Sequence, residues 1–321
     1  MTAIPSPQAP RHEPVMLHEA VEGLAVRPGG RYVDATIGLG GHAEAILDAA
    51  SPGGRLLGID RDPATLAASA TRLERFEDAV ELAHGNFGEI DDLCEAHDFV
   101  PVDGVLMDLG VSSMQLDSPG RGFSFQRSEP LDMRMDPGQE LTAAQIVNEY
   151  DEDELAQLIR EFGEERRART ISRAIVGRRP IRTTDELVSA VEQAAGRGRR
   201  RQIHPATLTF QALRIAVNQE MDNLADALPA ARSLLDGAGA RMVVIAFHSL
   251  EDRIVKNYFR RESTDCICPP RTPACICGHS ASLRRVTKRV RKPGEDEVAR
   301  NPRARSARMR VAESIVERTA A

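Results

Sequence analysis

The sequence predicts an α/β fold in which a mostly parallel, doubly wound sheet is interrupted by an inserted all-helical domain. Three observations carry this prediction. Short apolar runs alternate with helical patterns from Arg31 onward, which is the signature of βαβ units. The alternation stops at residue 116 and resumes after residue 215. The chain has 321 residues, more than one domain usually contains, so a large insertion is a natural expectation.

The first part of the predicted sheet is read from short apolar segments. We expect four strands, at residues 31–36, 55–60, 80–84 and 102–109. The last of them is almost continuously apolar, so it should be buried on both faces. A glycine-rich turn after the first strand opens a helix that runs through residues 43–50, and a second helix is expected at residues 63–75, with a proline in its first turn.

The central part reads as helical. The clearest helical patterns lie at residues 150–162, 164–176 and 184–195, and no convincing parallel strand separates them. We therefore expect residues 1–115 and 216–321 to form one domain. Residues 116–215 would form the inserted helical domain.

The α/β alternation then resumes. We expect one long helix at residues 207–235, because Asp236-Gly237 is a good signal for a helix end. A fifth strand at residues 241–247 and a helix at residues 250–260 follow. Two short strand candidates remain in the tail, at residues 286–290 and 307–312.

Composition excludes several classes of protein. Hydrophobic residues make up 41% of the chain, which is ordinary for a globular protein. No apolar run approaches the ~20 residues of a transmembrane helix, and residues 1–14 lack the apolar core of a signal peptide. We expect a cytoplasmic protein, not bound to a membrane, with a short disordered leader.

Charge is distributed unevenly along the chain. The net charge of −6 divides into −12 for residues 1–110 and +6 for residues 111–321. This asymmetry predicts a partner with phosphate groups; the alternative is a solvated charged surface. Arginine outnumbers lysine 39 to 3, so the position of the arginines matters more than their number. Three arginine-rich segments are candidates for phosphate contacts, at residues 166–182, 197–201 and 284–310.

A cofactor site is predicted where the first two strands end. The first strand leads from Asp34 into Gly38, Gly40 and Gly41, and the second ends at Asp60. Glycines allow the backbone to approach a ligand closely, and an acid at the end of the second strand is placed to bind a ribose. The alternatives are a plain tight turn and a surface loop.

Two adenosine cofactors share this geometry, namely NAD and S-adenosylmethionine. The glycines do not match the G-x-G-x-x-G dinucleotide pattern. An acid at Asp34 would also repel a pyrophosphate but attract the ammonium group of a methionine. The residues therefore favour S-adenosylmethionine.

Asp108 ends the fourth predicted strand and suits amine chemistry. An exocyclic amine is a poor nucleophile because its lone pair is delocalised into the ring. A carboxylate that accepts its N–H hydrogen bond would orient the amine and stabilise the developing positive charge. Methyl transfer would then be a direct displacement, with no metal and no covalent enzyme intermediate. The alternative is that Asp108 only caps the next helix.

Taken together, these motifs resemble those of the bacterial 16S rRNA (cytosine-N4)-methyltransferase family, also called RsmH or MraW. The resemblance extends over almost the whole chain, from His12 to Ala307. It is carried by Gly40-Gly41-His42, by Gly58-Ile-Asp60-Arg-Asp-Pro63, and by the run from Asp108 to Asp117. Further matches are Arg121-Gly-Phe-Ser-Phe125, Pro130-Leu-Asp-Met-Arg-Met-Asp136, Phe210-Gln-Ala-Leu-Arg-Ile-Ala-Val-Asn218 and Phe247-His-Ser-Leu-Glu-Asp-Arg253.

The resemblance implies a class I Rossmann-like methyltransferase sheet with an inserted helical substrate-recognition domain. It implies methylation of the N4 amine of a cytidine in the decoding region of 16S rRNA, within the small ribosomal subunit. The implied S-adenosylmethionine contacts are Gly40, Gly41, His42, Asp60, Phe87, Asp108 and Gln115. Candidate substrate contacts are Ser112, Ser113, Phe123, Phe125 and His248.

One departure from the wider amino-methyltransferase pattern concerns the target base. Those enzymes usually follow the acid or amide with Pro-Pro and an aromatic residue that stacks on the base. Here Leu109, Gly110 and Val111 occupy the following positions. A stacking ring must come from elsewhere, and Phe123 and Phe125 are candidates; the alternative is that both belong to the core of the insertion. His248 has a capping or core role as its alternative.

Four of the five cysteines form two C-x-C pairs, Cys266/Cys268 and Cys275/Cys277. Nothing indicates export, so a disulfide framework is not expected. The four thiolates could bind a structural zinc, although the spacing is not the usual C-x₂-C. The alternative is a reduced or redox-variable loop, and we expect no metal among the site residues.

Two other functions compete with the RNA methyltransferase. A DNA amino-methyltransferase would modify duplex DNA, and the missing Pro-Pro-aromatic segment argues against it. An RNA-binding assembly factor would keep the fold for its shape alone, and its function would not depend on Asp108.

Overall fold

The computed structural model describes residues 13–195 and 204–316. Most of the leader expected at residues 1–14, and the arginine-rich segment at residues 197–201, lie outside the described residues. Contacts divide the chain into two compact units. Unit 1 comprises Met1–Gly110 and Asp226–Ala321, and unit 2 comprises Val111–Ala225. The expected boundaries, at residues 115/116 and 215/216, lie several residues inside unit 2.

Unit 1 contains a seven-stranded sheet with the order β3-β2-β1-β4-β5-β7-β6. Strands β1 to β5 are parallel, β7 is antiparallel to β5, and β6 is antiparallel to β7. This mostly parallel sheet with flanking helices confirms the predicted fold class. The strands are β1 (Arg31–Asp34), β2 (Arg55–Asp60), β3 (Val80–His84), β4 (Gly104–Asp108), β5 (Arg241–Ala246), β6 (Leu283–Arg285) and β7 (Arg308–Ser314).

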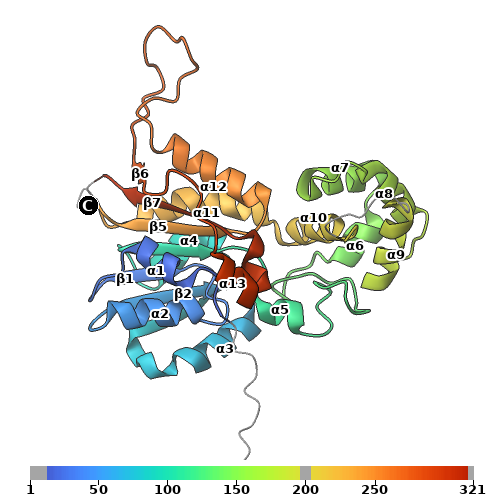
Figure 1. The fold of residues 1–321 in the computed structure, drawn as a ribbon, viewed down its shortest axis with the longest axis horizontal. Helices are drawn as coiled ribbons and strands as arrows, with labels where there is room; N and C mark the ends of the chain where they lie inside the picture. The colour runs from blue at the N-terminus through green and yellow to red at the C-terminus, as the bar shows by residue number, and fades with distance from the viewer. Residues whose placement is uncertain (1–12, 196–203, 317–321) are drawn as a thin grey trace, which may run out of the picture. The chain divides into compact units, whose positions relative to one another are not determined.

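Helices flank this sheet on both faces, with α1 and α2 on one and α11 and α12 on the other (Figure 1). The first face buries Leu56, Leu106 and Val243 against the helices. The α-helices are α1 (Leu17–Leu24), α2 (Gly41–Ala50), α3 (Pro63–Leu73), α4 (Ile90–Ala96), α11 (Glu220–Leu234, which begins in unit 2), α12 (Ser249–Arg261) and α13 (Glu295–Arg300). Short 3₁₀ segments are η1 (Glu74–Ala79), η2 (Phe87–Glu89) and η3 (Pro302–Ser306).

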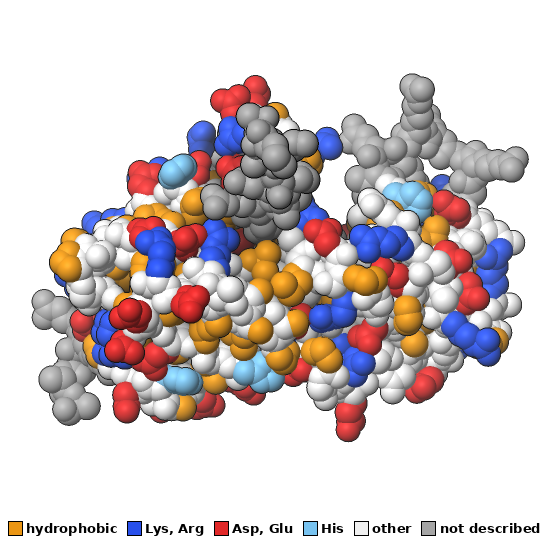
Figure 2. Space-filling view, turned by 90° about the horizontal axis from the view of Figure 1, so that it is seen from below, with side chains coloured by type: hydrophobic (Ala, Val, Ile, Leu, Met, Phe, Trp, Pro, Cys, Tyr) orange, Lys and Arg blue, Asp and Glu red, His pale blue; other side chains and the backbone are white. Residues whose placement is uncertain are grey.

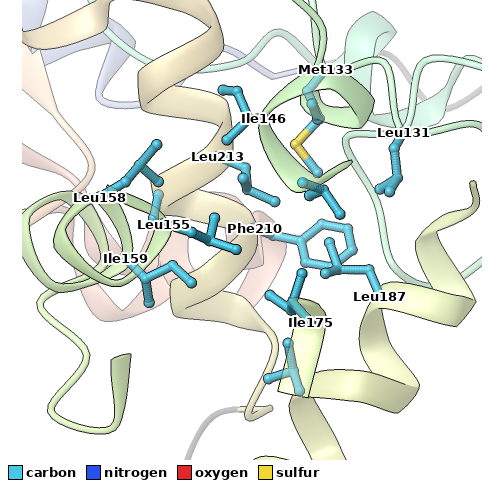
Figure 3. Packing of buried hydrophobic residues seen from close by; sticks show 14 of the residues in the cluster. Leu131, Met133, Ile146, Leu155, Leu158, Ile159, Ile175, Leu187, Phe210 and Leu213 are labelled. Carbon is cyan, nitrogen blue, oxygen red and sulfur yellow. The ribbon is translucent and has the colours of Figure 1, made fainter. Parts of the chain in front are cut away.

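Unit 2 is helical, and its described residues contain no named strand. Its helices are α5 (Ser113–Asp117), α6 (Ala143–Glu149), α7 (Glu152–Gly163), α8 (Ala168–Val176), α9 (Thr184–Ala195) and α10 (Thr207–Asn218). Apolar side chains from several of these helices meet in a separate core, in which the ring of Phe210 lies close to Leu187 and Ile175 (Figure 3). The unit therefore has its own hydrophobic core.

The long helix expected at residues 207–235 is wrong, because the structure divides it into α10 and α11 at Gln219. Gln219 has a φ of 50°, in the left-handed region. The preceding Asn218 is fully buried, and its side chain accepts a hydrogen bond from Met135 N–H and donates one to the Met133 carbonyl. These bonds fix the helix end on a distant loop, so the break depends on contacts far away in the sequence.

The strand expected at residues 286–290 is also wrong, because β6 lies at Leu283–Arg285 instead. The apolar residue Val286 is 43% exposed, so its hydrophobicity does not mark a buried strand. Within the described part of the chain, no helix combines the length and hydrophobicity needed to cross a bilayer.

Candidate active site

Three carboxylates lie at one edge of the unit 1 sheet. Asp34, Asp60 and Asp108 are the last residues of β1, β2 and β4, which are neighbouring parallel strands. The carboxyl ends of parallel strands meet at the same edge, where ligands of open α/β sheets bind. The sheet topology therefore brings these three acids together.

The turn between β1 and α2 depends on two of its glycines for its conformation. Gly38 and Gly40 have φ values of 53° and 74°, and Gly40 is the N-cap of α2. Gly41 serves packing, because a Cβ at this position would lie 2.2 Å from Pro14 Cγ. Its missing side chain makes room for the N-terminal segment of the chain. Ligand approach is thus not needed to explain Gly41.

Asp60 organises the loops around it. Its Oδ2 accepts a hydrogen bond from Gly38 N–H at 3.0 Å, and its Oδ1 accepts one from Asp62 N–H at 2.9 Å. Burial raises the pKa of Asp60 to about 6. Each carboxylate oxygen can accept more than one hydrogen bond, so both oxygens retain capacity for hydroxyl donors.

Asp34 is nearly inaccessible, with 1% of its surface exposed. Its Oδ1 accepts a hydrogen bond from Thr36 N–H at 3.2 Å, whereas its buried Oδ2 has no hydrogen-bond partner among the described residues. Burial, with a smaller contribution from the negative charge of Asp60, raises the pKa of Asp34 to about 7. A buried acceptor without a donor is costly, so a cationic donor bound here would stabilise the ionised form.

Asp108 is held by its backbone and leaves one oxygen of its side chain unused. Its N–H donates to Thr36 Oγ1 at 2.6 Å, which links the ends of β1 and β4. Its Oδ1 is buried and has no hydrogen-bond partner in the described part of the chain, although the side chain as a whole is 23% exposed. Burial, and then the charges of Asp34 and Glu251, raises the pKa of Asp108 well above its usual value.

The alternative that Asp108 caps the following helix is wrong, because the N-cap of α5 is Ser112. Asp108 ends a strand and is not held by a helix terminus. Its carboxyl group is therefore not used to cap a helix and is available to contact a ligand.

His42 lies beside Asp108 and is itself buried. His42 Nε2 is 3.0 Å from the carbonyl of Val15, which can only accept, so this nitrogen carries a hydrogen. In a neutral ring, Nδ1 then presents its lone pair towards Asp108 Oδ2 at 3.6 Å. That separation is too long for a hydrogen bond between the two groups.

Phe247 is an aromatic residue beside Asp108 that we did not predict as a site residue. It follows β5, whose Ile245 accepts a hydrogen bond from Leu109 N–H at 2.9 Å. Its ring lies 3.6 Å from the position that a Cβ on Gly110 would occupy. Glu251, which is 2% exposed, holds the backbone there by accepting from Phe247 N–H at 2.7 Å.

His248 caps α12. Its Nδ1 accepts from Glu251 N–H at 3.4 Å, and Glu251 Oε2 accepts from His248 N–H at 3.2 Å, which together form a capping box. Its side chain is 9% exposed. The capping alternative therefore explains this residue, and its contact with RNA stays a prediction.

Phe87 begins η2, directly after β3, and its side chain is half-buried. Gly85 N–H donates to the Asp60 carbonyl at 3.1 Å, so the loop that carries Phe87 is attached to the end of β2. The backbone that carries Phe87 is thus at the same edge of the sheet as Asp60.

The remaining predicted residues belong to unit 2, where Ser112 and Gln115 form a capping box on α5. Gln115 N–H donates to Ser112 Oγ at 3.2 Å, and Ser112 N–H donates to Gln115 Oε1 at 3.0 Å. Ser113 and Gln115 are 8% and 3% exposed. These contacts explain Ser112 and Gln115 structurally, and their cofactor and substrate roles stay predictions.

Phe123 belongs to the core of unit 2, and Phe125 lies at the margin of that core. Phe123 is 8% exposed within that core. Phe125 packs against it, with its ring stacked on His204 at 4.8 Å and edge-on to Phe210 at 5.3 Å. Both rings already have partners, which favours the core alternative over base stacking.

Several of the predicted phosphate-binding arginines have partners within the chain. Arg179 donates from Nε to the Val147 carbonyl at 2.7 Å, and Arg310 contacts Asp252 through two nitrogens. Arg285, Lys288 and Arg289 are exposed. Figure 2 shows one face of the molecule, on which basic side chains are interspersed with acidic ones. A continuous basic field is not seen on that face.

Comparisons with known proteins agree over nearly the whole chain. Residues 9–315 match the MraW methylase family. The chain is 56% identical over 306 residues to the ribosomal RNA small subunit methyltransferase H of Dehalococcoides mccartyi, covering 95% of this chain and 87% of that protein. It is 53% identical over 316 residues to the protein of the same name from Thermomicrobium roseum, covering 98% and 96%.

Proposed function

Because the chain belongs to the MraW methylase family, we propose that it methylates the exocyclic N4 amine of a cytidine in 16S rRNA, using S-adenosylmethionine. The observation that carries this proposal is Asp108, a partly accessible carboxyl at a strand end with one buried oxygen left without a donor. The names of the relatives support a substrate in the small ribosomal subunit.

The residues at the sheet edge fit the cofactor. Asp60 retains acceptor capacity for the ribose hydroxyls, and Phe87 is suited to cover the adenine. The unpartnered Oδ2 of Asp34 fits the ammonium group of the methionine moiety. The bound cofactor would supply a methyl group on a positively charged sulfonium, which the surrounding carboxylates favour electrostatically. An NAD pyrophosphate would be repelled by the same charges.

Asp108 and His42 would handle the proton of the target amine. The accessible side of the Asp108 carboxylate, at Oδ2, would accept the N–H hydrogen bond of the amine and orient its lone pair for direct methyl transfer. The methylated nitrogen must then lose a proton. Asp108 can accept it because its surroundings raise its pKa, and His42 Nδ1 can share it.

The aromatic ring of Phe247 is the candidate for contact with the base. It follows β5, the strand next to β4, and its partly buried ring packs with one side against the core of unit 1. This position supplies the ring that the segment from Leu109 to Val111 lacks. We propose that unit 2 recognises the RNA, with exposed basic residues of the chain contacting phosphates. Cytoplasmic localisation accords with such a substrate.

The function is tested by methyl transfer from labelled cofactor. Small ribosomal subunits from a strain that lacks the endogenous enzyme are incubated with the protein, and the modified nucleotide is mapped. We expect one labelled cytidine with methyl on N4. Naked 16S rRNA and duplex DNA serve as comparison substrates. Absence of any labelled cytidine with a folded protein would contradict the proposal, and label in duplex DNA would favour the DNA enzyme instead.

Cofactor affinity should fall at low pH because Asp34 must be ionised to bind an ammonium group. A carboxyl with a pKa of about 7 in the free protein is about 91% ionised at pH 8 and about 9% ionised at pH 6, so we expect roughly tenfold weaker binding at pH 6. Asp60, with a pKa of about 6, should add to this loss. Isothermal titration calorimetry at pH 6, 7 and 8 measures the effect. A dissociation constant independent of pH would show that Asp34 does not bind the cation.

A further inference from the structure

The loop between α12 and β6 carries four cysteines that the proposed reaction does not use. It projects from unit 1 beyond both elements (Figure 1). Its two ends meet at Glu262, whose carbonyl accepts from Ser282 N–H at 2.8 Å and from Leu283 N–H at 2.9 Å. Each of the two chain segments that form the loop carries one C-x-C pair.

All four sulfur atoms lie within 4.8 Å of one another. The Sγ–Sγ distances are 3.9 Å for Cys268–Cys275, 3.5 Å for Cys275–Cys277 and 3.9 Å for Cys277–Cys266. A disulfide would require about 2.05 Å. Four thiolates placed about 2.3 Å from a central zinc at tetrahedral angles would be about 3.8 Å apart. The three Sγ–Sγ distances are close to this value, and the other three do not exceed 4.8 Å.

Backbone N–H groups point at the sulfurs in a reciprocal arrangement. Ile267 N–H donates to Cys277 Sγ, and Ile276 N–H donates to Cys268 Sγ, both at 3.4 Å. The middle residue of each pair thus donates to the second cysteine of the other pair. Such donors stabilise thiolates, which are the metal-binding form of cysteine.

A short turn between the pairs holds them in this arrangement. Thr272 donates to the Pro269 carbonyl through its N–H at 3.2 Å and its Oγ1 at 2.7 Å. Pro269 and Pro270 further restrict the backbone here. The turn brings Cys268 and Cys275 face to face, with their Sγ atoms 3.9 Å apart.

The loop lacks a hydrophobic core that could account for the cysteines. Cys266 and Cys275 are exposed, and Cys268 and Cys277 are only partly buried, although cysteine is among the residues most often buried in proteins. The apolar side chains in the loop face solvent, with Ile267 at 47% and Ile276 at 84% exposure. Apolar packing therefore does not explain why these four side chains converge.

We propose that Cys266, Cys268, Cys275 and Cys277 bind one structural zinc ion. A tetrahedral set of four sulfurs selects zinc or iron, and a site closed by four protein ligands has no position left for a substrate. A cluster of several irons would need its thiolates spread around a larger group. This proposal decides between the two alternatives left open by the sequence, namely a structural zinc and a reduced or redox-variable loop. The unusual C-x-C spacing is no obstacle, since the crossing of two chain segments completes the tetrahedron.

The test is metal analysis of the full chain, purified without a metal-binding tag from cells grown with zinc. We expect about one zinc per chain. The variant Cys268→Ala/Cys277→Ala should lose at least ~90% of it. Two controls should keep it: Ile267→Ala/Ile276→Ala changes the same loop but no ligand, and Cys94→Ala changes the buried cysteine of α4. Replacement of zinc by cobalt should give the intense visible absorption of a tetrahedral cobalt thiolate centre.

Three results would overturn the proposal. The first is protein without zinc that has four reactive thiols in this loop. The second is a pair of disulfides, detected by mass spectrometry of protein purified under reducing conditions. The third is iron in place of zinc. If the double-cysteine variant does not fold, the cobalt spectrum and zinc content of the wild-type chain decide the question alone, since neither requires a variant or any methyl transfer.

Discussion

Replacing Asp108 by alanine should reduce kcat by about 10³- to 10⁴-fold, and replacing it by asparagine should reduce kcat by at least about 10²-fold. Alanine removes the acceptor for the amine N–H and the charge that stabilises the transition state. Asparagine keeps the shape and one acceptor oxygen but carries no negative charge, and it cannot take the proton that the methylated nitrogen releases. The difference between the two variants therefore separates orientation of the amine from charge and proton transfer.

Single-turnover methylation of small subunits measures this effect, and calorimetry measures cofactor binding by the same variants. We expect the cofactor to bind to Asp108→Asn within a few-fold of wild type, because the loss concerns the transition state. Asp92→Asn is the matched control, since it makes the same change at an exposed residue of α4 and should leave kcat unchanged. An Asp108→Asn protein that binds cofactor and keeps more than half of the wild-type rate would refute the mechanism.

Much of unit 1 could be predicted because local pattern and tertiary environment agree there. The strands predicted at residues 55–60 and 80–84 match the structure to the residue, and so does the helix predicted at residues 184–195 in unit 2. Buried parallel strands give continuous apolar runs, and helix ends carry their own signals. Where the decisive contact is distant, as for Asn218 and the break at Gln219, no local pattern marks it.

The candidate site divides in the same way. Asp60 and Asp108 could be predicted because a strand end is visible in the sequence, and the sheet topology brings strand ends together. The role of Thr36 could not, since its Oγ1 accepts from a backbone N–H 72 residues away. Phe247 was not named as a candidate although it ends the strand predicted at residues 241–247, because its nearness to Gly110 depends on the pairing of β5 with β4.

Some predicted site residues have local roles that a motif cannot reveal. Gly41 accommodates Pro14, and His248 and Ser112 cap helices. A sequence motif records that a residue type is required but not which contact requires it. Phe123 illustrates the point, because an aromatic in a distinctive motif fills the core of unit 2.

Asp34→Asn should have two opposite effects, namely loss of cofactor binding and a gain in stability of the cofactor-free protein. The variant keeps the oxygen that accepts from Thr36 N–H but loses the charge that would bind an ammonium group. Removing one partner of a buried charged contact commonly costs about 2–5 kcal/mol, so we expect at least ~30-fold weaker binding. Calorimetry with the cofactor measures this loss.

The gain in stability follows from the raised pKa. Folding moves the pKa of Asp34 from 3.8 to about 7, so the stability that this group contributes is fully present below pH 3.8 and is lost as the pH rises through 7. At 1.36 kcal/mol for each pKa unit, ionisation of buried Asp34 destabilises the free protein at pH 8 by about 4 kcal/mol. An amide avoids this penalty but buries new N–H donors. We therefore expect the free energy of unfolding to rise by about 2 kcal/mol at pH 8, and by less or not at all at pH 5.

Urea unfolding of the wild-type and Asp34→Asn proteins at the two pH values measures the difference. If the variant binds the cofactor with normal affinity, Asp34 is not part of the site. If the free energy of unfolding rises equally at both pH values, the buried charge of Asp34 is not what destabilises the free protein.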